Sequence, residues 1–163
     1  MKLIEHFVGG KIIPGSSENK GKVFNPATGE QEKEVRLASK TDLDKAVLIA
    51  QKAFEEWSLK PPLQRARIFF KFKELIEKNS DEITKLIVNE HGKVYEDAKG
   101  SLTRGLEVVE FACGIPHLLK GEFSENVGTN VDSWSIRQPL GVVAGITPFN
   151  FPAMVPMWMF PIA

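Results

Sequence analysis

The sequence predicts an α/β protein in which a parallel sheet has only begun. Three observations support this fold class: short strand-like runs near the start, four helical segments between about 41 and 114, and a continuous apolar run at 140–146. A run of that composition is typical of a parallel strand buried on both faces. Strands, then helices, then a buried strand leading to a helix together indicate an α/β arrangement.

The beginning of the chain predicts two hairpins. Apolar runs at 3–8 and 11–13 flank a Gly-Gly pair, which favours a tight hairpin turn. Short apolar runs at 23–24 and 35–37 flank a turn-rich Asn-Pro-Ala-Thr-Gly stretch. We therefore expect a first hairpin over 3–13 and a second over 23–37.

Helical periodicity begins near residue 41. The segment 41–44 resembles a capping box, with Asp44 in the place usually held by Glu or Gln. Pro61-Pro62 ends this first helix and starts the second. Ser80 is a favourable N-cap for a third helix, which Gly92 is expected to stop.

The later elements are less regular. A fourth helix is expected from about 95 to 114, ended by Pro116. The polar stretch 121–130 contains glycine and predicts a loop, whereas 134–137 alternates like a half-buried strand. Pro152 suits the first turn of a helix that follows the buried strand.

The charges balance, since 21 Lys and Arg residues oppose 21 Asp and Glu residues. This argues against a nucleic-acid-binding protein, which usually carries a basic excess, and against docking on anionic lipid. The start of the chain shows no signal-peptide pattern, and the single cysteine, Cys113, fits a reducing compartment. We therefore expect a cytoplasmic protein with no nucleic-acid partner.

The stretch 138–163 carries no charged side chain. Such a segment must be buried in protein or in a membrane. Prolines interrupt it repeatedly, and a proline inside a helix costs about 3 kcal/mol or more, so a membrane helix is rejected. Burial in a larger fold is the better interpretation, and the apolar end at Ala163 indicates a portion of a longer protein.

The sequence offers few residues for metal or nucleophilic chemistry. The three histidines lie in no metal-ligand spacing, so no metal site is predicted. Cys113 and His117 are four residues apart, but Pro116 between them interrupts a shared helical face. Cys113 is therefore interpreted as a small buried thiol rather than as a nucleophile.

Two polar residues are better candidates. Asn150 follows the predicted buried strand, at the end where open α/β sheets bind ligands. Its amide either donates a hydrogen bond to a developing oxyanion or caps the next helix, and spacing leaves both open. Arg104 lies within the fourth helix, where it either recognises a carboxylate or, as is commoner, is a solvated surface arginine that can pair with Glu107 or Glu110.

Several segments together resemble the aldehyde dehydrogenase family. Asn-Pro-Ala-Thr-Gly at 25–29 is similar to the turn that opens most members, and 90–93 looks like their Glu-x-Gly-Lys helix end. Thr-Pro-Phe-Asn-Phe-Pro at 147–152 resembles a strand-end motif usually written with Trp before the Asn. Phe149 and the segments 104–110 and 154–161 most resemble the methylmalonate-semialdehyde branch of the family.

The resemblance implies a Rossmann-like cofactor domain, a catalytic domain and a small β oligomerisation domain. Residues 1–120 would form hairpins and a helical layer of the cofactor domain, and 121–139 part of the oligomerisation domain. Residues 140–163 would form the first strand and the helix start of the Rossmann-like sheet, with the catalytic domain outside this chain. A homo-oligomer, dimer or tetramer, is expected for the full-length protein.

The resemblance also implies NAD-dependent oxidation of methylmalonate semialdehyde or malonate semialdehyde. A cysteine thiolate attacks the aldehyde, hydride passes to NAD, and the thioester is released to coenzyme A. Asn150 matches the oxyanion-hole asparagine, and Arg104 matches the arginine that binds the substrate carboxylate. The remaining positions match the cofactor side (Ile146, Thr147, Pro148 and Phe149) and the substrate tunnel (Phe151 and Trp158).

Two departures from the family pattern matter. The nucleophilic cysteine, its glutamate partner, the cofactor-binding lysine and the phosphate-binding glycine motif all lie downstream in the family, and Cys113 does not match the nucleophile. Catalysis by this chain alone is therefore not expected. Ser101 stands where relatives often have a carboxylate three positions before the arginine, which puts the orientation of Arg104 in question.

Two alternatives stand beside a coenzyme-A-acylating enzyme. The first is a non-acylating aldehyde dehydrogenase that releases a free acid. The second is a non-catalytic short form that pairs with full-length subunits through an exposed edge strand near 131–138.

Overall fold

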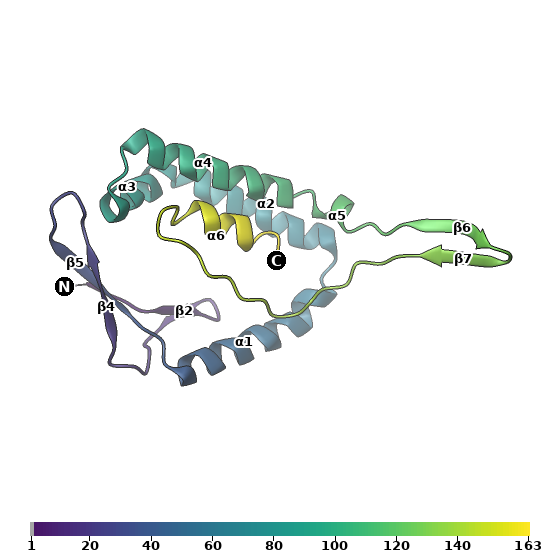
Figure 1. Ribbon diagram of the computed structural model, residues 1–163, viewed down its shortest axis with the longest axis horizontal. Helices are drawn as coiled ribbons and strands as arrows, with labels where there is room; N and C mark the ends of the chain where they lie inside the picture. The colour runs from purple at the N-terminus through teal and green to yellow at the C-terminus, as the bar shows by residue number, and fades with distance from the viewer. Residues whose placement is uncertain (1) are drawn as a thin grey trace.

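The computed structural model describes residues 2–163. Figure 1 shows small N-terminal sheets, a layer of helices, and a two-stranded arm that extends away from the body. The last helix lies against the helical layer, and a long connection without regular structure leads to it from the arm.

Both predicted hairpins are confirmed. Strand β2 (His6–Val8) pairs antiparallel with β3 (Lys11–Ile13), and β4 (Lys20–Phe24) pairs antiparallel with β5 (Gln31–Arg36). The run 3–8 is not one strand, however, because β1 (Lys2–Ile4) pairs in parallel with β5 and belongs to a different sheet from β2.

Glu5 lies at the break between β1 and β2. Its carboxylate accepts hydrogen bonds from Arg36 Nε at 2.8 Å and from the Gly15 amide at 3.1 Å. The hydrogen bond from Arg36 keeps the pKa of Glu5 below its ordinary value. A charged side chain anchored in this way interrupts the apolar run and directs its two halves into different sheets.

The helices follow the predicted order. They are α1 (Lys40–Leu59), α2 (Pro62–Lys78), α3 (Ser80–His91), α4 (Tyr95–Ala112), the short α5 (Ile115–Leu118) and α6 (Met154–Met159). Pro62 occupies the first turn of α2, as predicted. Gly92 ends α3 in the left-handed conformation at φ 80°, which glycine adopts without steric cost.

The capping predictions for α1 and α3 were wrong in position. The capping box of α1 is formed by Ser39 and Asp42, whose side chains each accept the other's backbone N–H, at 3.1 and 2.9 Å. Asp44 instead accepts a hydrogen bond from Lys40 at 2.7 Å. Ser80 is already helical, and the residue before α3 is Asn79, whose side chain makes no capping hydrogen bond.

The fourth helix ends earlier than predicted. Helix α4 stops at Ala112, and Pro116 lies in the first turn of α5 instead of ending α4. A proline is tolerated there because first-turn N–H groups have no partner within the helix. Cys113 and His117 therefore do not share one continuous helix.

The arm consists of β6 (Phe123–Gly128) and β7 (Val131–Trp134), paired antiparallel. The prediction of a loop at 121–130 was therefore wrong, and the strand predicted at 134–137 ends at Trp134, within the exposed edge strand expected near 131–138. Every residue of both strands is exposed, so no buried face imposes an alternating apolar pattern on the sequence. A register shift between Ser124 and Gly128 disturbs the pattern further.

The apolar run 140–146 does not form a strand in this structure, contrary to the prediction. Leu140 is 94% and Ile146 is 96% exposed, and the segment has no strand assignment. A parallel strand needs a neighbour to accept and donate its ladder of hydrogen bonds. Residues 2–163 provide no partner strand beside this run.

The packed core lies where α4 meets α2, α3 and α6. Leu102 and Val109 of α4 and Met157 of α6 form its buried cluster. Gly105 permits the close approach, because a methyl group on it would lie 3.2 Å from the Met154 Cα and would also meet the Met157 side chain. This contact fixes α6, and with it the segment 151–158, against α4.

Candidate functional site

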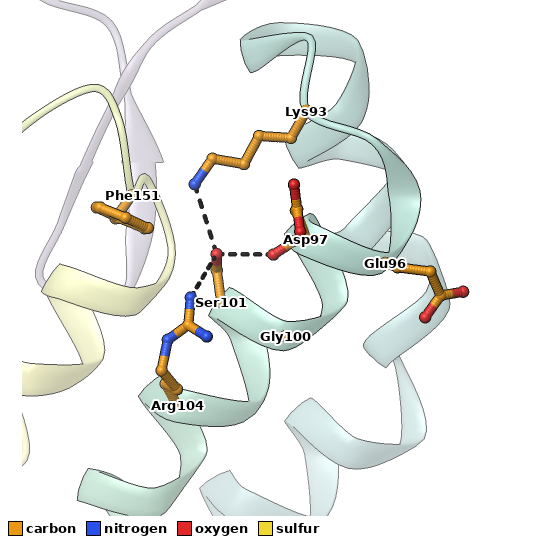
Figure 2. A pocket seen from close by; sticks show the side chains of 7 residues that line it. All are labelled: Lys93, Glu96, Asp97, Gly100, Ser101, Arg104 and Phe151. Atoms are coloured by element: carbon orange, nitrogen blue, oxygen red, sulfur yellow. Dashed lines mark hydrogen bonds between the residues drawn. The ribbon is translucent and has the colours of Figure 1, made fainter.

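A cavity of about 460 Å³ opens beside the N-terminal half of α4. Figure 2 shows that most of its lining comes from one face of α4 and that Phe151 covers it from the loop before α6. The lining residues are Lys93, Glu96, Asp97, Gly100, Ser101, Arg104 and Phe151. The cavity therefore joins two segments that are more than forty residues apart in the sequence.

Ser101 is the centre of the polar contacts in this cavity. Its side chain is almost fully buried, and Oγ donates a hydrogen bond to the Asp97 carbonyl at 2.8 Å. The same oxygen accepts from Arg104 Nη2 at 3.4 Å and from Lys93 Nζ at 3.5 Å (Figure 2). A neutral hydroxyl thus holds two cationic side chains loosely, where a carboxylate would neutralise them.

Lys93 has a second contact, with an aromatic ring. Its Nζ lies 3.7 Å from the centroid of the Phe151 ring, well inside the range of a cation–π interaction. Figure 2 shows the lysine extending from the turn before α4 toward Phe151 and Ser101. Sequence reasoning assigned no role to Lys93, although it ends the Glu-x-Gly-Lys motif that supported the family resemblance.

Arg104 is exposed, as the surface alternative for this residue predicts, but it forms no ion pair with Glu107 or Glu110. The ion pairs formed within residues 2–163 include neither Arg104 nor Lys93, and Glu110 lies 3.7 Å from Lys73 instead. Asp97 lines the cavity, and the Glu96 side chain points away from the other lining groups in Figure 2. The Arg104 guanidinium is therefore available to an anionic ligand.

The structure brings the three predicted substrate residues together. Arg104 and Phe151 line the same cavity. Trp158 of α6 donates from Nε1 to the backbone carbonyl of Arg104 at 3.3 Å, which places its indole beside the same turn of α4. This cluster combines one cation with two aromatic rings, a composition suited to a small organic anion.

The predicted cofactor residues lie elsewhere. Ile146, Thr147, Pro148 and Phe149 belong to an exposed segment, and none of them lines the cavity. Asn150 is also exposed and is followed directly by Phe151. It does not cap α6, because that helix begins after Ala153 and has no side-chain cap, so the capping alternative for Asn150 is wrong.

Cys113 behaves as the buried thiol that the sequence predicted. It is buried, it forms no disulfide, and burial raises its pKa above the ordinary value, which disfavours the reactive thiolate. Lys73 opposes this shift, and Glu110 adds to it. Among residues 2–163, no group of three or more His, Cys, Asp or Glu side chains is arranged to hold a metal ion.

None of the helices within residues 2–163 is long and apolar enough to cross a membrane.

Comparison with known proteins identifies the family. The sequence profile of the aldehyde dehydrogenase family matches residues 12–163. A malonate-semialdehyde dehydrogenase of Pseudomonas aeruginosa is 52% identical over 163 residues, which is all of this chain and 33% of that protein.

Two solved structures share the fold closely. A methylmalonate-semialdehyde dehydrogenase of Oceanimonas doudoroffii is 56% identical, with a TM-score of 0.95 over 99% of this chain and 33% of that chain. A protein of Sinorhizobium meliloti 1021, assigned as a methylmalonate-semialdehyde dehydrogenase and solved with NAD, is 51% identical, with a TM-score of 0.95 over the same shares. The predicted α/β fold is therefore confirmed. The chain spans about a third of the length of these relatives, and it belongs to the aldehyde dehydrogenase family.

Proposed function

We propose that this chain is the part of an NAD-dependent semialdehyde dehydrogenase that recognises the substrate carboxylate. The full-length enzyme oxidises malonate semialdehyde or methylmalonate semialdehyde and transfers the acyl group to coenzyme A. The names of the relatives support this substrate class. The observation that carries the proposal is the Arg104 guanidinium, which forms no ion pair within residues 2–163, in an open cavity that Phe151 also lines.

The substrate explains why a cation is needed. A semialdehyde of this class carries a carboxylate at one end and the reacting aldehyde at the other. The Arg104 fork offers two parallel N–H donors that match a carboxylate. Ser101 holds the guanidinium through one long hydrogen bond, at 3.4 Å, so a bound carboxylate has only this weak hydrogen bond to displace. The aromatic faces of Phe151 and Trp158 contact the short carbon chain.

Asn150 is proposed to serve the reacting end of the substrate. It adjoins Phe151, and its side-chain amide donates hydrogen bonds to the aldehyde oxygen as negative charge develops there. Removal of one such donor costs about 2.7–4 kcal/mol of transition-state stabilisation. In this proposal Arg104 fixes one end of the substrate and Asn150 the other.

The chemical character of the segment 146–149 suits the binding of NAD. The segment 146–149 is exposed and uncharged, and it offers apolar side chains and one hydroxyl to a planar ring system. When bound, NAD accepts the hydride, and coenzyme A accepts the acyl group. We further propose that the full-length protein is a cytoplasmic homo-oligomer, in which 121–139 belongs to the oligomerisation domain and 1–120 and 140–163 to the cofactor domain.

The proposal is tested on the full-length enzyme. Initial rates of NADH formation are measured with malonate semialdehyde, with methylmalonate semialdehyde and with propanal, each with and without coenzyme A. The expected result is a strong preference for the two semialdehydes and formation of acyl-CoA. A free acid formed at the same rate without coenzyme A indicates a non-acylating enzyme, and no preference over propanal contradicts carboxylate recognition.

A further inference from the structure

We propose that Lys93 is a positioning residue of this site, which holds Phe151 and thereby the adjacent Asn150 amide in place. This inference rests on the proposed function, because it assigns Asn150 and Phe151 to the reacting site. The Lys93 ammonium contacts Phe151 and Ser101, which both line the cavity, and it forms no ion pair within residues 2–163.

The connection before α6 is attached to the body of the protein at Phe151. Positions 142–150 are all exposed, and Phe151 is the first residue after them that is half-buried. Its ring lies under the Lys93 ammonium at 3.7 Å. The Lys93–Phe151 contact thus attaches the end of this segment to the turn between α3 and α4, whereas Gly145, earlier in the segment, lies beside the Met159 side chain of α6.

Lys93 is itself held by the local backbone and by a hydrogen bond. Its position is fixed by the turn between α3 and α4, which Gly92 shapes with a φ of 80°. The Lys93 ammonium also donates to Ser101 Oγ at 3.5 Å. Because Lys93 is half-buried and faces no carboxylate within 4.0 Å, its charge is directed at the ring face. Partial desolvation strengthens an interaction of this kind.

Lys93 differs in its contacts from Arg104, the proposed substrate-binding cation. Arg104 and Lys93 both donate a hydrogen bond to the Ser101 hydroxyl, but the Lys93 ammonium also lies over the face of the Phe151 ring. Lys93 therefore acts on substrate through the position of Phe151 and Asn150. Loss of its charge is expected to lower kcat, whereas loss of a substrate-binding cation raises KM for an anionic aldehyde.

The experiment uses the full-length enzyme with Lys93→Met, which keeps the chain length and removes the charge, and Lys93→Arg, which keeps the charge and stacks on aromatic rings. Lys99→Met is the matched control, because Lys99 lies on the outer part of α4, where it pairs with Asp81 and lies 5.8 Å from the Tyr95 ring. Phe151→Leu and the double variant Lys93→Met/Phe151→Leu complete a double-mutant cycle.

The first readout is independent of activity. Amide hydrogen exchange of the peptide that contains 149–153 is measured by mass spectrometry in all variants. Deuterium uptake is expected to rise in Lys93→Met and to stay at the wild-type level in Lys93→Arg and Lys99→Met. Unchanged uptake in Lys93→Met overturns the proposal, even if the enzyme oxidises a different aldehyde from the one proposed above.

The second readout is kinetic. We expect kcat with malonate semialdehyde to fall roughly 3- to 10-fold in Lys93→Met, with KM within twofold of wild type, and Lys93→Arg to recover most of the loss. The effects of Lys93→Met and Phe151→Leu are expected to be non-additive. A raised KM with unchanged kcat would show that Lys93 binds the substrate directly, and a loss that Lys93→Arg does not restore would show a purely structural role.

These two readouts also separate the inference from the proposed function. A wild-type enzyme that does not oxidise either semialdehyde contradicts the proposed substrate. The exchange measurement then still decides whether Lys93 holds the 149–153 segment.

Discussion

The uncharged stretch 138–163 divides into two regions with opposite environments. Met154 and Met157 of α6 are buried against α4, and Met157 is only 5% exposed. Leu140, Ile146 and Phe149, which are equally apolar, project from the connection that precedes α6, and Phe149 is 95% exposed. The difference lies in the partner, because Gly105 of α4 offers α6 a close surface while residues 2–163 offer the connection no neighbouring strand.

The comparison shows what composition predicts and what it leaves open. A charge-free segment must be buried somewhere, but its composition does not say against what. The proposed substrate residues Phe151 and Trp158 are placed because α6 packs on α4. The proposed cofactor residues 146–149 have no such support in the described part of the chain.

The largest expected effect on stability is at α6. We expect Met157→Ala to lower the free energy of unfolding of the 163-residue chain by about 2–5 kcal/mol, since it opens a cavity against α4. Leu140→Ala is the matched change in the exposed connection and is expected to stay within about 0.5 kcal/mol of wild type. Urea unfolding followed by circular dichroism measures both. Equal effects at the two sites contradict the comparison.

A pair of glycines on α4 tests the close approach of α6 more finely. Gly105→Ala is expected to lower the free energy of unfolding by about 1–3 kcal/mol, because the added methyl meets Met157 and the Met154 backbone. Gly100→Ala meets nothing closer than Arg104 Nη1 at 3.8 Å, and should raise the same quantity by up to about 1 kcal/mol. Opposite shifts of the thermal midpoint support the packing, and a gain in both variants refutes it.

Ser101→Ala should have a smaller effect. It removes the acceptor shared by Lys93 and Arg104 and the 2.8 Å bond to the Asp97 carbonyl. A typical loss is about 1 kcal/mol of unfolding free energy. Thr103→Ala, which removes a similar hydroxyl bond to the Lys99 carbonyl at an exposed position, is the control and should change less. The denaturant midpoints of the two variants measure this difference in unfolding free energy.

The smallest effect concerns α1, which has no buried residue and relies on its polar cap. The hydrogen bond that the Ser39 backbone N–H donates to the Asp42 carboxylate is the main reason why the pKa of Asp42 lies well below its ordinary 3.8. The carboxylate therefore stabilises the folded chain above about pH 4, and this contribution is lost as the pH falls below that value. Asp42→Asn should flatten the acid side of the stability curve, measured as unfolding midpoints between pH 2 and 7. An unchanged acid slope contradicts this assignment.

The sequence predicted elements best where their signals are local. Pro62 and Gly92 punctuate the helices as expected, because proline and glycine act on the backbone at their own positions. Strand β6 was missed because it is exposed throughout and no alternation marks it, whereas an exposed edge strand was expected near 131–138, where β7 lies. The strand at 140–146 was predicted from composition alone, and residues 2–163 provide no partner strand for it.

The candidate site was predicted in part. Arg104, Phe151 and Trp158 were chosen from the family resemblance, and the structure places them together. Lys93 was not chosen, because its importance depends on a ring 58 positions away that only tertiary structure brings to it. Spacing along a sequence carries no signal for a contact of that kind.

The central claim is that Arg104 recognises the carboxylate of a semialdehyde. Its most direct test is kcat/KM of the full-length enzyme for malonate semialdehyde and for propanal, compared between wild type and Arg104→Met, with the exposed Arg67→Met of α2 as control. We predict a loss of about 100-fold for the semialdehyde in Arg104→Met, less than threefold for propanal, and no loss in the control. An equal loss for both aldehydes would contradict carboxylate recognition by Arg104.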